Sequence, residues 1–285
     1  MLLSPTVRNK NFREELWSKG YKETSYWLEG LFPLKEAVEI PPRNVDVAIV
    51  GSGYTGLNAA LQTSRGGRST VVLEAADPGF GCSTKNGGQV STSIKPSFEK
   101  LSVKLGQEKG LAIRKEGENA LDWIEEFVSS ENIDCSFVRS GRYHAAHTPK
   151  HYEMITRDAE KLSRSEGVEA YAVPSSEQLK ELGSEVYHGG VVFPRHASLD
   201  PGKYHRGLLQ RVVEAGVDVI GNCAVMDIEK AADGFILKTP KGRVKARDVI
   251  VATNGYTTKL TPWLQRRVIP IGSYIIATEK LNPSL

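Results

Sequence analysis

The 285-residue chain contains little cysteine, and its cysteines are scattered. Cys82, Cys135 and Cys223 form no C-x-x-C pair. Because their number is odd and they are few and far apart, they argue against a disulfide framework and for a reducing compartment. No run approaches the roughly 18 apolar residues that a membrane helix needs. The N-terminus is charged and aromatic and lacks the apolar core of a signal peptide. We therefore expect a cytoplasmic protein without a membrane span.

Strong charge is also lacking. The formal net charge is only +3, and basic spots such as Arg266-Arg267 are short and interrupted, so we expect no nucleic-acid partner. No internal repeat or low-complexity segment is visible. With 40% hydrophobic residues, the composition is that of an ordinary globular protein, long enough for a full core and two domains or lobes.

The most informative stretch is the mainly apolar run Val45–Val50, which leads into a Gly-x-Gly-x-x-Gly motif. A helix-compatible segment, residues 57–64, follows the motif. A second β-rich run, residues 69–73, then ends on Glu74. This order of strand, tight turn, helix, strand and acid is the order that a dinucleotide-binding βαβ unit requires. The alternative is a glycine-rich turn in some other α/β protein, which leaves the position of the acid as a coincidence.

Each glycine has a physical role in the nucleotide interpretation. Gly51 makes the tight turn, Gly53 lets the backbone approach a pyrophosphate, and Gly56 allows close packing of helix and strand. The phosphates would lie at the helix N-terminus, where unpaired N–H groups and the helix dipole favour anions. A carboxylate at Glu74 can accept two ribose hydroxyls. The predicted cofactor-binding residues of this unit are Gly51, Gly53, Tyr54, Thr55, Gly56, Glu74 and Ala75.

A second glycine-rich loop, residues 81–89, follows closely. Its small residues and hydroxyls can bring several donors to one anion or to a flat heterocycle. Because a two-nucleotide cofactor must also be held at its far end, this loop is a candidate for that end. The alternative is a flexible surface loop.

The remaining pattern predicts further elements. The aromatic N-terminal stretch, with Trp17, Tyr26 and Trp27, predicts a leader packed over the main domain; the two later aromatic residues could instead face a ligand. We expect helix over 97–130, a strand pair over 135–147 with Gly141 between the strands, a helix opened by Thr148-Pro149, and a helix capped by Asp200 and begun by Pro201. The C-terminal part is expected to contain further strands. They are strand 217–220, a meander of strands 224–229, 235–239 and 243–246, a buried strand 248–253 and one more strand within 268–278.

Five of these stretches together resemble the D-amino-acid oxidase/sarcosine oxidase superfamily of FAD-dependent oxidoreductases, and most closely its gamma-glutamylputrescine oxidase-like branch. They are residues 47–56, 71–75, 81–89, 199–208 and 251–256. The Asn-Gly-Gly loop and the Ala-Thr-Asn-Gly-Tyr strand end are the more specific of the five. Because family members continue well past Leu285, the chain resembles a form truncated at its C-terminus.

The resemblance implies an α/β fold, α+β overall. An FAD-binding Rossmann-like domain with a mostly parallel central sheet and an antiparallel meander would cover 45–100 and 190–264, behind a leader over 1–44. An inserted substrate domain with an antiparallel sheet, incomplete here, would cover 101–189 and 265–285. The further FAD contacts that the resemblance implies are Ser83, Thr84, Asn86, Gly87, Gly88 and Gln89 beside the phosphoribityl chain and ring, Val225 at adenine, and Ala252, Thr253 and Gly255 over the nucleotide half.

The implied activity is oxidation of a C–N bond in a small-molecule amine or amino acid, with hydride passing to FAD and the imine product hydrolysed. No acid or base for this reaction can be identified; Gln89 is a candidate near the ring, and His196 a candidate on the substrate side or a surface histidine without a role. Three alternatives remain. The first is a truncated, non-catalytic FAD-fold module. The second is an NAD-dependent enzyme, which the Asn-Gly-Gly loop disfavours. The third is a metal site at His144, His147 and His151, but no acid or cysteine completes a ligand set there. The expected metal content is none.

Overall fold

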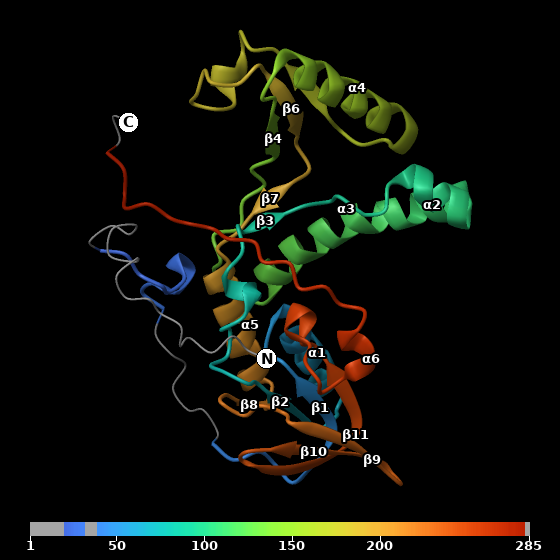
Figure 1. Cartoon of the computed structure of the whole chain (residues 1–285), viewed down its shortest axis with the longest axis vertical. Helices are drawn as coiled ribbons and strands as arrows, with labels where there is room; N and C mark the ends of the chain where they lie inside the picture. Colours follow the sequence, from blue (N-terminus) through green and yellow to red (C-terminus); the bar gives the residue numbers. More distant parts are fainter. Residues whose placement is uncertain (1–19, 32–38, 283–285) are drawn as a thin grey trace. The chain divides into compact units, whose positions relative to one another are not determined.

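The computed structural model describes residues 20–31 and 39–282 (Figure 1). By contact, the chain forms two compact units: residues 1–87 with 201–285, and residues 88–200 inserted between them in the sequence. The predicted domain boundaries near residues 100, 189 and 264 remain predictions, because the boundaries of a contact unit need not coincide with those of a domain.

The first unit contains a six-stranded sheet. Its elements are η2 (Tyr26–Leu28), β1 (Asn44–Val50), α1 (Tyr54–Arg65), β2 (Thr70–Leu73), η3 (Cys82–Thr84), α5 (Pro201–Glu214), β8 (Asp218–Ile220), β9 (Asp227–Ala231), β10 (Gly234–Thr239), β11 (Gly242–Val251), η5 (Asn254–Tyr256) and α6 (Pro262–Gln265). The strand order is β8-β2-β1-β11-β10-β9. Strands β8, β2, β1 and β11 are parallel, and β9 and β10 continue the sheet as an antiparallel meander. The predicted mostly parallel sheet with a meander is confirmed.

Side-chain alternation along β1 and β2 divides the core between the two faces of this sheet. Ala48 and Val50, with Val71 and Leu73, belong to a buried cluster that also includes residues of β8, β10 and β11. The intervening Ile49 faces α1. If a Cβ atom were added to Gly56 of that helix, it would lie 3.4 Å from Ile49 Cγ2. Helix α1 packs on β1 and β2 and against α5 (Figure 1). Burial on both faces explains the continuous apolar runs Val47–Val50 of β1 and Val71–Leu73 of β2.

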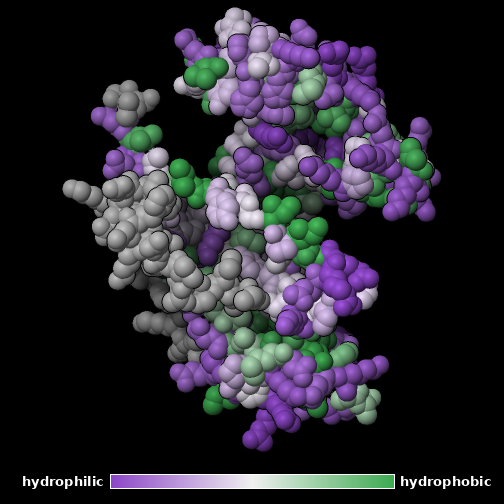
Figure 2. Space-filling view, in the orientation of Figure 1, coloured by the Kyte–Doolittle hydropathy of each residue, from purple (hydrophilic) through white to green (hydrophobic). Residues whose placement is uncertain are grey.

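The second unit contains two small antiparallel sheets and three helices. Its elements are β3 (Gln89–Val90), α2 (Phe98–Leu105), α3 (Gln107–Ser130), β4 (Arg142–Ala145), α4 (Pro149–Glu166), β5 (Tyr171–Val173), η4 (Gln178–Lys180), β6 (Gly190–Phe193) and β7 (Ala197–Ser198). One sheet has the order β4-β6-β5, and β3 pairs with β7. Helix α4 covers the three-stranded sheet through Ile155 and Ala159. The solvent side of the α4 region is mainly hydrophilic (Figure 2).

Several predicted elements need correction. The expected helix over 97–130 is two helices, because the backbone of Gly106 takes φ +87° and ends α2. The expected strand pair over 135–147 contains one strand, β4, whose partner is the distant β6. The strands predicted at 243–246 and 248–253 are one strand, β11, which pairs with β10 and with β1. Strand β5 was not predicted.

The strand expected within 268–278 is absent from the part of the chain that the structure describes. Ile269 and Ile271 are 83% and 87% exposed, and no described strand pairs with this segment. A strand needs a partner for its backbone groups, so apolar β-branched residues alone do not make one.

Of the predicted leader over 1–44, residues 1–19, with Trp17, and residues 32–38 lie outside the described residues. Among those described, Ser25 and Trp27 hydrogen-bond to the loop around η3. Trp27 also packs closely on α5 at Gly202. A Cβ atom added to Gly202 would lie 2.0 Å from the Trp27 carbonyl oxygen. No helix among the described residues combines the length and apolar character that crossing a membrane requires.

Candidate functional site

The carboxyl ends of the four parallel strands meet at one edge of the first unit's sheet. Gly51 follows β1, Glu74 follows β2, and Ala252 follows β11. Their N–H groups continue the ladder, with bonds of 2.9 Å from Gly51 to the Leu73 carbonyl, from Glu74 to Ile220 and from Ala252 to Val50. This edge is where open α/β sheets bind ligands.

The turn after β1 leaves no space for a side chain at Gly51 or Gly56 and little at Gly53. Gly51 takes φ +106°, and a Cβ there would lie 2.8 Å from the Ala252 carbonyl oxygen. A Cβ on Gly56 would lie 1.9 Å from the carbonyl oxygen of Gly51. A Cβ on Gly53 would lie 3.0 Å from Ser83 Oγ. The two predicted motifs, the first glycine turn and the later loop, are therefore in direct contact.

The start of α1 is left available to an anion. Its N-cap residue, Gly53, has no side chain to accept from the first-turn N–H groups. Ser83 Oγ accepts a hydrogen bond from the Tyr54 N–H at 3.1 Å, which brings a hydroxyl to the same helix end. Helix N-termini with unpaired N–H groups bind phosphates.

Glu74 is oriented by the same turn. Its Oε2 accepts hydrogen bonds from the Ser52 N–H at 2.8 Å and the Ser52 hydroxyl at 2.7 Å, and its Oε1 accepts the Ala76 N–H at 3.2 Å. A carboxylate has about four acceptor positions, of which these bonds use three, so Glu74, which is half-buried, retains about one position for a hydroxyl outside the turn. Ala75 links Glu74 to this last donor.

The loop after β2 is fixed largely by its own hydrogen bonds. Thr84 is fully buried, and its hydroxyl donates to the Gly79 carbonyl at 2.5 Å. Asn86 Nδ2 donates to the carbonyls of Cys82 and Ser83, each at 3.1 Å. Their side chains therefore hold the shape of the loop, and what the loop offers a ligand is mainly backbone and the Ser83 hydroxyl.

The other predicted contacts divide between the two units. Val225 packs against the buried cluster of the first unit, and Thr253 shares a 2.9 Å hydroxyl contact with Thr257. Gly87 and Gly255 have space for a ligand, since a Cβ on either would meet nothing within 4 Å. Gly88 and Gln89 belong to the second unit, where the Gly88 carbonyl accepts from Leu199 and Gln89 pairs with Ser198 in β3 and β7.

The Cys82 side chain in the loop after β2 is exposed. Asn254 Nδ2 lies 3.5 Å from its Sγ, and the Tyr256 ring lies 3.4 Å from the position of a Cβ on Gly81. The thiol therefore lies where the loop 81–87 meets the end of β11.

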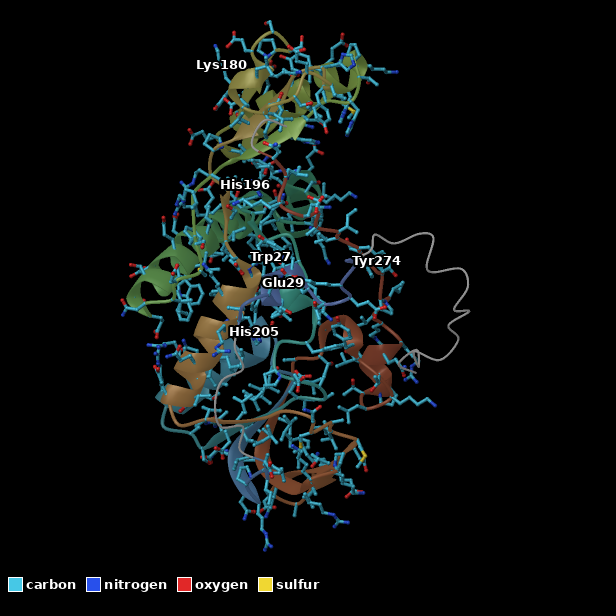
Figure 3. The ribbon with its side chains drawn as sticks, turned by 90° about the vertical axis from the view of Figure 1, so that its left-hand side faces the viewer. Trp27, Glu29, Lys180, His196, His205 and Tyr274 are labelled. Atoms are coloured by element: carbon cyan, nitrogen blue, oxygen red, sulfur yellow. The ribbon has the colours of Figure 1, made fainter. Side chains whose placement is uncertain are left out.

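His196 is a further correction, because it is buried rather than a surface histidine, and only 6% of it is exposed. Burial, with a contribution from Arg142, lowers its pKa below the ordinary value. His196, which is labelled in Figure 3, belongs to the second unit. Its described ring contact is with Phe193, with 5.9 Å between the ring centroids.

The three histidines considered for a metal lie near one another, with ring centroids 5.7 Å apart for His144–His151 and for His147–His151. His151 Nδ1 accepts the backbone N–H of His147 at 3.2 Å. Within residues 20–31 and 39–282, no group of three or more His, Cys, Asp or Glu side chains is arranged to hold a metal ion.

Sequence reasoning did not identify two residues at this edge. Ser52 is fully buried and bonds to Glu74, and His205 of α5 contacts the Ser52 carbonyl at 2.7 Å. A histidine within an apolar helix face is easily taken for a packing residue; its place in the stretch 199–208 was the available signal.

Comparisons with known proteins agree with this geometry. The model of the DAO family, described as FAD dependent oxidoreductase, matches residues 46–285. The chain is 30% identical over 241 residues to the gamma-glutamylputrescine oxidoreductase of Escherichia coli (strain K12), covering 84% of this chain and 56% of the relative. It is 30% identical over 268 residues to the probable oxidoreductase OrdL of Rhizobium meliloti (strain 1021), covering 93% and 61%. The chain thus spans about six tenths of the length of these curated relatives.

Among solved structures, the glycine oxidase from Geobacillus kaustophilus superimposes with a TM-score of 0.64 at 20% identity, covering 78% of this chain and 59% of the other. The L-amino acid deaminase from Proteus myxofaciens gives a TM-score of 0.62 at 19% identity, covering 78% and 48%. These likenesses show the fold.

Proposed function

Because the chain belongs to the DAO family of FAD dependent oxidoreductases, whose model matches residues 46–285, we propose that it binds FAD and oxidises a C–N bond of a small amine or amino acid. The observation that carries the proposal is the meeting of the Gly51–Gly56 turn, Glu74 and the Ser83 loop at one sheet edge.

The residues present fit the adenosine-diphosphate half of FAD. Gly51 and Gly53 leave the backbone bare where a diphosphate must approach. The first-turn N–H groups of Thr55 and Gly56 supply donors and a favourable dipole, beside Tyr54, whose N–H donates to Ser83 Oγ. Glu74 would accept a hydrogen bond from the adenosine ribose, with Ala75 beside it.

The other proposed contacts lie along the rest of the cofactor. Val225 would meet adenine through its backbone, and Ala252, Thr253 and Gly255 would cover the nucleotide half. The residues proposed beside the phosphoribityl chain and ring are Ser83, Thr84, Asn86, Gly87, Gly88 and Gln89.

The amine or amino-acid substrate is supported by the relatives. The Escherichia coli relative is named for gamma-glutamylputrescine, and the Geobacillus kaustophilus protein for glycine. When bound, FAD supplies a two-electron acceptor for the hydride of the substrate's α carbon, and the imine product is hydrolysed. The chain's own contribution is to bind and orient the cofactor and to exclude water from it.

The test is reconstitution of the chain with FAD, followed by anaerobic addition of a panel of amines and amino acids. We expect flavin absorbance bands in the washed protein and their bleaching by at least one compound. Bands that no compound bleaches would contradict the C–N oxidation and leave a flavin-binding module. Protein that retains no flavin would contradict the FAD proposal itself.

A further inference from the structure

His205 lies on the second turn of α5 and is almost completely buried, with 3% of its surface exposed (Figure 3). Its Nε2 lies 2.7 Å from the carbonyl oxygen of Ser52. A carbonyl can only accept, so Nε2 carries the hydrogen and donates. Burial lowers the pKa of His205 below its ordinary value, which is consistent with a neutral ring bearing that hydrogen.

Ser52 connects this histidine to the proposed ribose acid. The Ser52 N–H and hydroxyl both donate to Glu74 Oε2, and Ser52 Oγ also accepts the Gly79 N–H at 3.3 Å. All of the polar groups of Ser52 are thus occupied inside the protein, with its carbonyl held by His205.

The histidine ring also supports the loop that follows β2. Gly79 takes φ +87°, and a Cβ there would lie 2.7 Å from Cε1 of the ring. Because the imidazole fills this space, it touches both the Ser52 turn and the loop leading to Ser83. One side chain from α5 therefore sets the spacing of two segments that converge on the cofactor edge.

The position of the Ser52 carbonyl has a consequence at the next residue. In a trans peptide unit the carbonyl of one residue and the N–H of the next point in opposite directions. Holding the Ser52 carbonyl toward α5 therefore directs the Gly53 N–H away from α5. Among the described residues, no acceptor is bonded to that N–H, which lies at the start of α1.

We propose that His205 is a positioning residue for the cofactor, which fixes the Ser52–Gly53 peptide so that the Gly53 N–H and the Glu74 carboxylate are preset for the diphosphate and ribose. This inference rests on the proposed function, since it concerns how the same site binds FAD. It assigns no contact between His205 and the cofactor.

The experiment compares His205→Gln with His205→Leu. Glutamine can place its Nε2 donor near the position of the imidazole Nε2, whereas leucine leaves the buried Ser52 carbonyl unpaired. We expect His205→Leu to raise the Kd for FAD, and for ADP, roughly tenfold, because an unsatisfied buried polar group distorts the turn. His205→Gln should stay within about threefold of the wild-type value on the same basis. His144→Gln, in the second unit, is the matched control and should leave both Kd values unchanged.

The Kd values are measured by flavin fluorescence quenching and by ADP competition, at a temperature where circular dichroism shows each variant folded. If His205→Leu does not fold, His205→Asn takes its place, because the shorter amide does not reach the Ser52 carbonyl and should bind more weakly than His205→Gln. Wild-type affinity in His205→Leu, or equal weakening in the glutamine variant, overturns the inference alone. Wild-type protein that binds neither FAD nor ADP overturns the proposed function and this inference together.

Discussion

Gly56 shows most directly how one residue determines the candidate site. Replacing a glycine within a helix by alanine usually stabilises a protein by roughly 0.5–1 kcal/mol. Here a Cβ would lie 1.9 Å from the Gly51 carbonyl oxygen, so the added methyl must displace the turn. We predict that Gly56→Ala lowers the free energy of unfolding by about 2 kcal/mol and weakens FAD binding at least tenfold.

Chemical denaturation and flavin titration measure the two effects of Gly56→Ala. Gly183→Ala is the matched control, since a Cβ there meets nothing within 4 Å and its backbone is not in the left-handed region. A Gly56→Ala protein as stable as the wild type, with unchanged affinity, would show that the turn can relax without harm.

Histidine titration gives a pH prediction at the same scale. Burial is the largest cause that lowers the pKa of His144, His196 and His205 in the folded chain, whereas an unfolded histidine titrates near 6.5. Below about pH 7 the unfolded chain therefore binds more protons than the folded chain, and the folded chain loses stability as the pH falls toward 5. We expect Tm to fall between pH 7.5 and 5.5, and to fall less in His205→Gln, because one of the three groups is removed. An equal fall in both proteins would contradict this assignment.

At the scale of elements, η2 acts through two hydrogen bonds. The Ser25 hydroxyl donates to the Thr84 carbonyl at 2.6 Å, and the indole N–H of Trp27 donates to the Asn86 carbonyl at 2.8 Å. Both acceptors belong to the loop proposed to run beside the flavin. The N-terminal stretch thus adds two long-range hydrogen bonds to a loop that is otherwise held largely by its own hydrogen bonds.

We predict that Trp27→Phe weakens FAD binding by a factor of roughly 2 to 10, the range expected for one lost hydrogen bond. The ring is largely retained, so the fold should survive. Trp123→Phe is the control, because the Trp123 ring stacks on Phe127 within α3 and donates nothing to the loop. Flavin titration of both variants tests the prediction. Equal FAD affinities of the Trp27→Phe and Trp123→Phe variants would show that η2 does not contribute to FAD binding.

The elements also show why part of the fold was predictable. The β1–α1–β2 unit carries its own information, since an apolar run, three glycines and a terminal acid are local features. The continuity of β11 is not local. Its residues up to Ala246 pair with β10, and its residues from Lys245 to Val251 pair with β1, so β1 spans the break expected near Arg247. The partner of β4 is likewise distant in sequence.

The candidate site was predictable to the same extent. The glycines of the turn and Glu74 could be selected from the sequence, because the spacing of the glycines and the charge at the end of β2 are local features. The buried links do not, because His205 and Ser52 are important only through contacts across 153 residues of chain. Likewise, the hydroxyl of Thr84, predicted to serve the cofactor, is directed into its own loop.

At the scale of the whole molecule, the first unit is assembled from two separate segments of the chain. Residues 1–87 supply β1, β2 and the glycine turn, and residues 201–285 supply α5, β8 and β11. Of the seventeen proposed cofactor residues, only Gly88 and Gln89 lie in the other unit. The residues proposed for the adenosine-diphosphate half of FAD therefore all belong to one compact unit.

This containment predicts which ligands stabilise the chain. ADP shares the half of FAD that the first unit is proposed to hold, whereas FMN lacks the adenosine part, so ADP should raise Tm and FMN should not. A ligand at a hundred times its Kd stabilises the folded state by about 2.7 kcal/mol, which corresponds to roughly 5–10 °C for a chain of this size. Thermal unfolding with FAD, ADP and FMN, in the wild type and in Gly56→Val, measures the effect; the variant should respond to none of them. Equal stabilisation by FMN would instead place the binding energy at the flavin end, outside the glycine turn and Glu74.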